Sequence, residues 1–270
     1  MLILKVSLKE EQIIINILQG PVNGSFFNIY IKSHNNIFLC YNLIEVNMKR
    51  KKKLDIIYED KEILVVNKPS GVLTVSTPKE KEKTLFHEVS DYVKKSNPKA
   101  KVFIIHRLDK DTSGIVMFAK NQNIKYMYQN AWDKIVLKRG YVAVVNGKLN
   151  NKQDTIKSYL KETKTLFVYS SNKKDGKLAI TSYKVLKENK KYSMLDIEIK
   201  TGRKNQIRVH MKDINHPILG DKKYGIKDNA KRLMLHADEL ILINPKTKKK
   251  MEFISNAPSI FENLFKEEKR

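Results

Sequence analysis

A nine-residue polar stretch, His106 to Gly114, lies between two short apolar runs in this chain. Val102 to Ile105 precedes it, and Ile115 to Phe118 follows it. Short continuous apolar runs are typical of strands buried in a sheet, so the polar residues between them are expected to form a loop at a sheet end. Loops held by rigid strands are where functional side chains concentrate. This segment therefore constrains both the fold and the position of a site.

Strand and helix patterns around this loop indicate the fold class. Apolar runs bounded by turns predict strands at 55–58, 63–66, 141–145, 179–186 and 194–199. Helical spacing of apolar residues predicts helices over 85–93 and 124–132, and a further helix is expected between Gly202 and His216. Strands and helices that do not alternate strictly are typical of α+β domains. We predict an α+β fold with a mixed, largely antiparallel central sheet and flanking helices.

A run of basic residues over 49–53 divides the chain. Strand-like stretches precede it at 12–18, 26–31 and 37–46, and the pattern becomes more regular after it. The run can be a linker, a phosphate contact or a solvated stretch, and the last is the commonest. The length suits one sizeable domain with a small addition. We predict an N-terminal appendage over residues 1–53 and a main domain over residues 54–270.

The formal net charge of +24 is the strongest signal in the composition. A strongly basic surface attracts polyanions, of which nucleic acid is the usual one. An alternative is that a chain rich in Lys, Ile and Asn reflects an AT-rich genome, although that bias alone should not leave acidic residues so far behind. No basic amphipathic helix stands out in the sequence, so nucleic acid is favoured over an acidic membrane as the partner.

Cys40 is the only cysteine in the sequence, so no internal disulfide and no cysteine–histidine zinc cluster are expected. The first residues, Met1 to Gln12, are too short and too soon charged for a signal peptide. No apolar run approaches the ~18 residues that a membrane span needs. We therefore expect a cytoplasmic, monomeric protein with no metal site and no membrane partner.

Asp109 is the candidate for chemistry within the polar loop. The cationic residues Arg107 and Lys110 lie close to it in sequence, and a carboxylate kept ionised by cations can act as a nucleophile. The alternative is a structural turn in which the side chains of residues 111–113 cap backbone groups. Both interpretations can hold together, with Asp109 as the reactive group and the other residues as its scaffold.

Arginine use adds to this interpretation. The 53 basic residues comprise seven arginines and forty-six lysines. In a chain that uses lysine by default, an arginine indicates a need for the planar guanidinium, which can donate two parallel hydrogen bonds. Arg107, Arg203 and Arg208 fall in the two most motif-like stretches of the chain. For any one of them taken alone, a simple surface cation is the commoner explanation.

The loop over 106–114 resembles the H-R-L-D-x-x-T-S-G signature of the RluA-type pseudouridine synthase family. Further stretches resemble motifs of this family in the family's order, at residues 60–71, 141–147, 201–210, 220–225 and 232–237. The resemblance covers roughly residues 54–260, and six ordered motifs are a specific signal. Asn205 stands where many members have histidine, and Arg139 replaces a commoner lysine. The small RNA-binding module of many members is not recognisable in residues 1–53, so the appendage is interpreted as a degenerate module or an unrelated segment.

The resemblance implies a pseudouridine synthase fold and the isomerisation of uridine to pseudouridine in RNA. Asp109 would be the nucleophile, attacking either ribose C1′ or uracil C6. Arg208 would pair with Asp109 and keep it ionised, and Tyr141 would stack on the uracil and assist proton transfer. Without the resemblance, cross-strand packing would be the preferred role for Tyr141. Because the target base must leave the stack to reach Asp109, base flipping is expected.

Five further residues are expected by the same resemblance to bind substrate: His106, Arg107, Arg203, Gln206 and Ile207. No cofactor is expected, because the reaction is redox-neutral and the sequence carries no dinucleotide-binding loop or metal cluster. Ribosomal RNA, in particular that of the large subunit, is the preferred substrate, and transfer RNA is the alternative.

Two other functions are alternatives to this one. The stretch Asp109-Lys110-Asp111-Thr112 after an apolar strand imitates the Asp-x-Asp-x-Thr loop of Mg²⁺-dependent aspartyl phosphatases. That class also needs a late pair of acids, for which Asp221 offers a start but Gly225 stands where the second acid should be. A catalytically inactive RNA-binding or assembly protein is the other alternative, and the intact Asp109, Tyr141 and Arg208 argue against it.

Overall fold

The computed structural model describes residues 54–78, 80–171 and 175–266, together with the backbone of four strands that precede them. Contacts divide the chain into two compact units, Met1–Lys53 and Leu54–Arg270. The first unit is an antiparallel sheet of β1 (Leu2–Leu8), β2 (Glu11–Ile17), β3 (Asn28–Ser33) and β4 (Asn36–Cys40), paired in chain order. β2, β3 and β4 overlap the strand-like stretches predicted there, whereas β1 was not predicted. The remainder of the predicted stretches lies outside the described residues.

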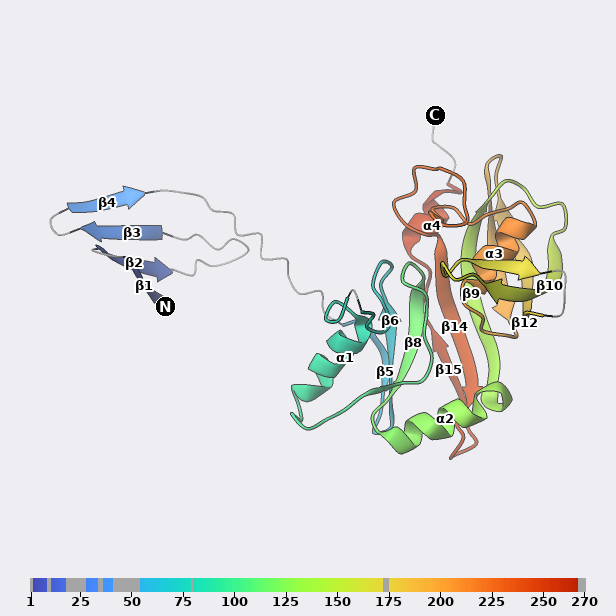
Figure 1. The fold of residues 1–270 in the computed structure, drawn as a ribbon, viewed down its shortest axis with the longest axis horizontal. Coiled ribbons are helices and arrows are strands. Elements are labelled where there is room, and N and C mark those ends of the chain that lie inside the picture. The colour runs from blue at the N-terminus through green and yellow to red at the C-terminus, as the bar shows by residue number, and fades with distance from the viewer. Residues whose placement is uncertain are drawn as a thin grey trace. The chain divides into compact units, whose positions relative to one another are not determined.

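The second unit is built on one large sheet with the strand order β11-β10-β12-β13-β9-β14-β8-β6-β5, to which β15 and β7 are added beside β14 and β8 (Figure 1). Its strands are β5 (Ile56–Glu59), β6 (Ile63–Lys68), β7 (Phe103–Ile104), β8 (Ser113–Ala119), β9 (Val136–Asn146), β10 (Gln153–Glu162), β11 (Val168–Ser171), β12 (Lys177–Glu188), β13 (Tyr192–Ile199), β14 (Leu235–Ile243) and β15 (Lys250–Ile254). The pairing of β14 with β8 is parallel, and the other strand pairings described for this sheet are antiparallel. The prediction of a mixed, largely antiparallel sheet is confirmed.

Within the described part of this unit, four helices flank the sheet: α1 (Leu85–Lys94), α2 (Gln122–Ile135), α3 (Gln206–Asp213) and α4 (Ser259–Asn263). The first three lie where the sequence predicted them. Thr84 and Asn121 start α1 and α2 by accepting the backbone N–H of His87 and Ile124 on their side-chain oxygens. None of the described helices combines the length and the apolar character needed to cross a membrane.

The apolar runs of β6 and β8 are continuous because these strands are covered on both faces. Ile63, Val65 and Met117 pack in one cluster with α2, whereas Leu64 and Val116 pack in another with α1. Successive residues of a strand point to opposite faces, so a strand between two helices must be apolar at every position. Figure 1 shows α1 next to β5 and β6, and α2 across the lower ends of the strands in this view.

Gly114 allows β8 and β14 to approach at the end of the polar loop. Its φ is +118°, and a Cβ there would lie 2.1 Å from the carbonyl oxygen of Ala237. Both the backbone conformation and the close contact therefore require glycine. This approach places the polar loop beside β14, and β14 in turn lies against β9.

Candidate active site

A cavity of about 80 Å³ lies where the polar loop, β9 and the start of α3 meet. It brings together seven of the eight residues that the sequence analysis selected: Arg107, Asp109, Tyr141, Arg203, Gln206, Ile207 and Arg208. The residues come from segments that are up to about a hundred positions apart in the chain, so the sheet topology gathers them. His106, the eighth, has a different environment that is described below.

The segment that follows β6 holds the main chain around Asp109. The Thr74 hydroxyl donates to the carbonyl of Leu108 at 2.7 Å and accepts the N–H of the same residue at 3.2 Å. The Ser70 hydroxyl donates to the carbonyl of Asp111 at 2.6 Å. These hydrogen bonds bind the backbone on both sides of Asp109, and they leave its carboxylate uninvolved. Within the described residues, that carboxylate accepts no hydrogen bond.

Lys68, at the end of β6, is a fully buried residue that also supports the loop. Its Nζ donates to the carbonyls of Pro69 at 3.0 Å, Val72 at 2.7 Å and Lys110 at 2.8 Å. Three carbonyl acceptors match the three N–H groups of an ammonium. Burial lowers the pKa of Lys68 to about 7, although nearby aspartates act in the opposite direction. The Lys-Pro turn is thus a structural support for the loop, a role that its sequence alone did not reveal.

Asp109 lies in a strongly electropositive environment. Burial raises the pKa of Asp109 above its ordinary value, and the charges of four cations oppose this rise: Arg208, Arg107, Lys68 and Lys204. The sequence analysis expected the neighbouring cations, together with Arg208, to keep Asp109 ionised. The structure corrects this, because burial works against ionisation and most of the opposing charge comes from segments distant in sequence.

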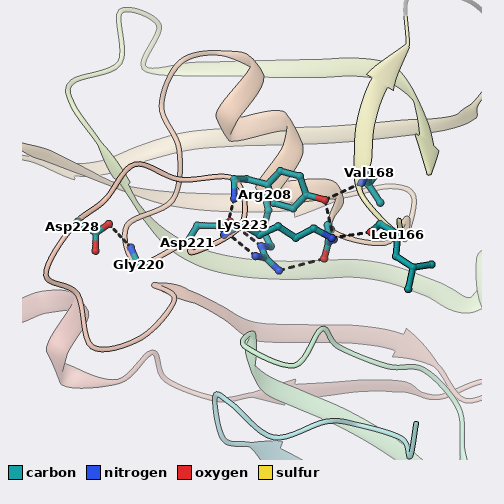
Figure 2. A network of polar contacts seen from close by, with 9 residues as sticks. Leu166, Val168, Arg208, Gly220, Asp221, Lys223 and Asp228 are labelled. Carbon is teal, nitrogen blue, oxygen red and sulfur yellow. Dashed lines mark hydrogen bonds and ion pairs between the residues drawn. The ribbon is translucent and has the colours of Figure 1, made fainter. Parts of the chain in front are cut away.

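Arg208 is held by Asp221 and not by Asp109. Its Nε and Nη2 donate to the two carboxylate oxygens of Asp221 at 2.8 and 2.7 Å, and its Nη1 donates to Asn205 at 3.3 Å (Figure 2). The expected direct pairing of Arg208 with Asp109 is therefore wrong for this structure. Arg208 still acts on Asp109 through its charge, since each lies in the same cavity and shifts the pKa of the other toward the ionised form.

Asp221 is a buried carboxylate with four donors. Besides Arg208 it accepts the backbone N–H groups of Lys223 and Tyr224, each at 2.9 Å. Burial opposes its ionisation, but the guanidinium and these N–H groups hold the pKa of Asp221 below its ordinary value. The Arg208 guanidinium also lies over the Tyr224 ring, 5.2 Å from the centroid. The loop motif at residues 220–225 is thus the support for Arg208.

Asn205 completes the support from the other side. It has a φ of +53°, a left-handed conformation that asparagine tolerates better than most residues. Its side-chain amide donates to the Tyr224 hydroxyl at 3.0 Å, and its Oδ1 accepts from Arg208. Figure 2 shows how this network joins the start of α3 to the loop that carries Asp221. Asparagine at this position, noted above as a departure from the family pattern, fits the contacts that surround it.

Tyr141 lines the cavity from β9. Burial raises the pKa of Tyr141 to about 12, and the charges of Asp109 and Asp238 act in the same direction. The phenol therefore stays protonated at neutral pH. In this state it can donate a hydrogen bond or a proton, and it presents a flat apolar ring to the cavity.

His106 and Gln206, both expected to bind substrate, have contacts typical of scaffold residues. His106 accepts the backbone N–H of Met117 on Nε2 at 3.2 Å, and its ring packs against Trp132 at 5.0 Å. Burial lowers its pKa to about 4, so the ring is neutral. The amide of Gln206 is engaged with the Ile180 carbonyl and three other protein groups. By contrast, Arg107 and Arg203 are exposed at the cavity.

A network of hydrogen bonds lies at the Ser113 end of the polar loop. Arg232 donates to the Ser113 hydroxyl, which lies 2.7 Å from Nδ1 of His236, and Nε2 of His236 lies 2.9 Å from the Ser255 carbonyl. Since a carbonyl only accepts, His236 carries its proton on Nε2 and accepts from Ser113 on Nδ1. Burial lowers the pKa of His236 to about 4, in agreement with a neutral ring. Sequence patterns did not predict this hydrogen-bond network, because its residues are far apart in sequence.

The sequence profile of the RNA pseudouridylate synthase family matches residues 62–213 of the chain. A protein of Borreliella burgdorferi named ribosomal large subunit pseudouridine synthase D is 38% identical over 216 residues, which are 76% of this chain and 66% of that protein. A protein of Haemophilus ducreyi named tRNA pseudouridine synthase C is 32% identical over 79% of this chain and 95% of its own length.

The fold has a counterpart among solved structures. The human protein RNA pseudouridylate synthase domain containing 4 superimposes with a TM-score of 0.64 over 77% of this chain and 90% of that chain. Its sequence identity is 21%, so the likeness concerns the fold. The profile match spans the loop with Asp109, the strand with Tyr141 and the helix with Arg208. The chain therefore belongs to the RNA pseudouridylate synthase family.

Proposed function

We propose that this protein isomerises uridine to pseudouridine in RNA, with Asp109 as the nucleophile. The observation that carries the proposal is the state of the Asp109 carboxylate. It lines a cavity beside the protonated Tyr141, cations surround it, and no hydrogen bond within the described residues occupies its oxygens. A nucleophile needs an oxygen with a free lone pair and a counter-charge that favours the ionised form.

In the proposed reaction the N1–C1′ bond of uridine breaks and a C5–C1′ bond forms. The proton on C5 leaves, and N1 gains a proton, so the reaction is an isomerisation with no other reactant. Asp109 attacks either ribose C1′ or uracil C6 and is released when the new bond is complete. The uridine must leave its stack to enter the cavity, as for other enzymes that act on a base.

Each neighbour of Asp109 has a role in this proposal. Arg208 supplies a positive charge that Asp221 keeps in place, and it favours the ionised nucleophile. Tyr141 stacks on the uracil and donates or relays a proton. Arg107 and Arg203, exposed at the cavity, contact the RNA, and Ile207 provides an apolar wall. The contacts of His106 and Gln206 favour a supporting role over direct substrate binding.

The substrate that we prefer is large-subunit ribosomal RNA, and transfer RNA is the second candidate. Relatives named for each activity match this chain at 38% and 32% identity, so the names support RNA as the substrate class without choosing between the two. The net charge of +24 is consistent with a polyanionic substrate.

An aspartyl phosphatase is disfavoured by the position of Asp221, the late acid on which that alternative depended. Both of its carboxylate oxygens accept from Arg208, and one of them also accepts two backbone N–H groups. An oxygen pair committed in this way is a poor ligand for Mg²⁺, which binds through free carboxylates and water.

Release of tritium from RNA labelled at uridine C5 tests the function. The purified protein is incubated with ribosomal RNA and, separately, with transfer RNA from cells that lack this gene, in monovalent salt with EDTA. We expect release from at least one pool, and greater release from ribosomal RNA. The proposal fails if neither pool releases tritium. It is also overturned if the protein hydrolyses a phosphate monoester in an Mg²⁺-dependent reaction and releases no tritium.

A further inference from the structure

A second, larger cavity adjoins the one that contains Asp109. It has a volume of about 230 Å³ and shares Ile199, Gly202 and Arg203 with the first cavity. Its other walls come from the end of α2, the beginning of β9 and the end of β13. The charged residues that line it are Asp133, Lys138, Arg139, Glu198, Lys200 and Arg203. The site proposed above leaves this space without a function.

Two arginines are anchored in this second cavity by backbone carbonyls. Arg139 donates through Nη2 to the carbonyl of Lys200, and Arg203 donates through Nε to the carbonyl of Leu178 at 2.9 Å. A Cβ at Gly202 would lie 3.0 Å from Nη1 of Arg139, so the absence of a side chain there gives the guanidinium room. Each anchor orients a guanidinium and leaves some of its five N–H donors available.

The two arginines differ from the lysines beside them in how their charge is balanced. Lys138 pairs with Glu239 at 2.5 Å, and Lys200 pairs with Glu198. Over residues 54–266, as far as the structure describes them, no salt bridge joins Arg139 or Arg203 to a carboxylate.

The electrostatics of Arg139 reflect this lack of a close counter-charge. Burial lowers the pKa of Arg139, and the charge of Arg203 acts in the same direction, while Asp133 and Glu198 oppose it from a distance. The cavity thus holds two like charges that an anion between them would stabilise.

The choice of arginine strengthens this observation. Residues 54–266 contain five arginines, of which four line one or both of the adjoining cavities: Arg107, Arg139, Arg203 and Arg208. Lysine is the common cation elsewhere in this chain, so the arginines are concentrated where a planar group that donates paired hydrogen bonds is useful. Phosphate oxygens are the acceptors that suit such a group in RNA.

From this geometry we infer that Arg139 and Arg203 form a subsite for one backbone phosphate of the RNA, next to the nucleotide whose base enters the Asp109 cavity. The inference rests on the proposed function for the identity of the ligand as RNA. The wall shared at Gly202 and Arg203 places this phosphate next to the Asp109 cavity. Binding here fixes the strand relative to Asp109, since phosphate contacts determine register and orientation without reading sequence.

The salt dependence of RNA binding tests the subsite without requiring turnover. A fluorescently labelled ten-nucleotide oligouridylate is titrated with the full-length protein by fluorescence anisotropy at several potassium chloride concentrations. The test variant is Arg139→Gln/Arg203→Gln. The matched control is Lys138→Gln/Lys200→Gln, which removes the same charge from the same cavity but affects cations that are already paired. Thermal melting checks that each variant is folded.

One neutralised phosphate contributes about 0.7 to the slope of log affinity against log salt for single strands. We expect the slope of the arginine variant to be smaller than that of the lysine control by about this amount. Equal slopes for the two double variants would overturn the subsite, and so would a difference of about twice this size, which indicates two separate phosphates. If the double arginine variant does not fold, Arg203→Gln against Lys200→Gln gives the same comparison, because Arg203 is exposed.

The test separates the subsite from the proposed function. If the wild-type protein releases no tritium, but the arginine variant has the expected smaller slope, the phosphate subsite stands and the isomerase function is refuted. If the wild-type protein releases tritium, but the arginine variant has the same slope as the lysine control, the isomerase function stands and the subsite is refuted.

Discussion

The two charged residues at the centre of the site, Asp109 and Arg208, are held in opposite ways. Asp109 is positioned through the backbone on either side of it, by hydrogen bonds from Lys68, Ser70 and Thr74, and its carboxylate is left without a hydrogen bond within the described residues. Arg208 is positioned through its side chain, because its guanidinium donates twice to Asp221.

This difference follows from what each group must do. A nucleophile has to change its bonding during the reaction. Because the support holds the backbone of Asp109 and not its carboxylate oxygens, no hydrogen bond has to break when the carboxylate reacts. A counter-charge acts by staying in place, so a bidentate partner is the suitable support. Removing a support of Asp109 and removing the support of Arg208 should therefore have different effects.

Among changes to the supports of the two residues, the largest effect is expected when the support of Arg208 is removed. Asp221→Asn keeps the shape of the side chain but leaves a buried guanidinium without its counter-charge. Breaking a buried ion pair in this way costs about 3–5 kcal/mol of unfolding free energy. A guanidinium displaced by about 1 Å also lowers the single-turnover rate by about 10²-fold.

Urea unfolding and tritium release measure these two effects. Asp228→Asn is the matched control, because Asp228 lies in the same loop and, among the described residues, accepts backbone N–H groups and no side-chain cation. These N–H groups belong to Gly220, which Figure 2 shows, and to Ala230. An Asp221 variant as stable and as active as the Asp228 variant would show that Arg208 does not depend on Asp221.

A smaller effect is expected when one backbone support of Asp109 is removed. Thr74→Val is nearly isosteric and leaves the buried N–H and carbonyl of Leu108 without this partner, at a cost of about 2 kcal/mol. The loop then holds Asp109 less firmly, and we expect the saturated rate to fall by about tenfold. Thr77→Val, in the same segment but outside the loop contacts, controls for the loss of a hydroxyl. Equal unfolding free energies and rates for the two variants would contradict the support role of Thr74.

Acid should lower the unfolding free energy of the protein. Burial lowers the pKa of His106, His210 and His236 to about 4 from an ordinary value of 6.5. Between these two values the unfolded chain binds more protons than the folded chain. The unfolding free energy therefore rises with pH in this window and is lost as the pH falls from 6.5 toward 4.

The slope of unfolding free energy against pH measures this contribution. Replacing one buried histidine removes at most about 1.4 kcal/mol per pH unit from the slope. We expect His236→Asn to flatten the slope relative to the wild-type protein. An unchanged slope for the His236 variant would mean that this histidine is not neutral in the folded protein.

The smallest effect on chemistry is expected from removal of residues 1–50. Every residue proposed to take part in catalysis lies in the unit Leu54–Arg270, so the saturated single-turnover rate should stay within about threefold of the full chain. RNA affinity or site choice should fall more than the rate. An insoluble fragment, or a collapse of the saturated rate, would mean that the N-terminal segment is part of the catalytic fold.

Sequence patterns predicted the central part of the fold because its physical causes are local. Continuous apolar runs marked β6 and β8, which are covered on both faces, and capped amphipathic spacing marked α1 and α2. The last two strands at one end of the sheet, β10 and β11, were missed. Their polar, partly exposed residues carry no continuous apolar run, and they exist as strands because β12 pairs with β10.

The members of the candidate site were easier to predict than their contacts. Ordered motifs identified Asp109, Tyr141 and Arg208, and the cavity does gather them. The partner of Arg208 was assigned wrongly, because sequence cannot show which of two carboxylates a guanidinium reaches. Asp221 was part of the family motif at residues 220–225 and of the phosphatase alternative, but it was not recognised as the partner of Arg208. Lys68 was missed as a support because a lysine that donates to three carbonyls has no local sequence pattern.

The most direct test of the account is the single-turnover rate of Asp109→Asn, measured with saturating protein on RNA labelled with tritium at uridine C5. Asparagine preserves the shape of the side chain and the backbone supports, but it removes the nucleophile. Asp111→Asn removes the same charge from the same loop and serves as the control. The account predicts no detectable release for Asp109→Asn with RNA affinity nearly intact, and release within about tenfold of wild type for Asp111→Asn. Release by Asp109→Asn within about tenfold of wild type would contradict the assignment of Asp109 as the nucleophile.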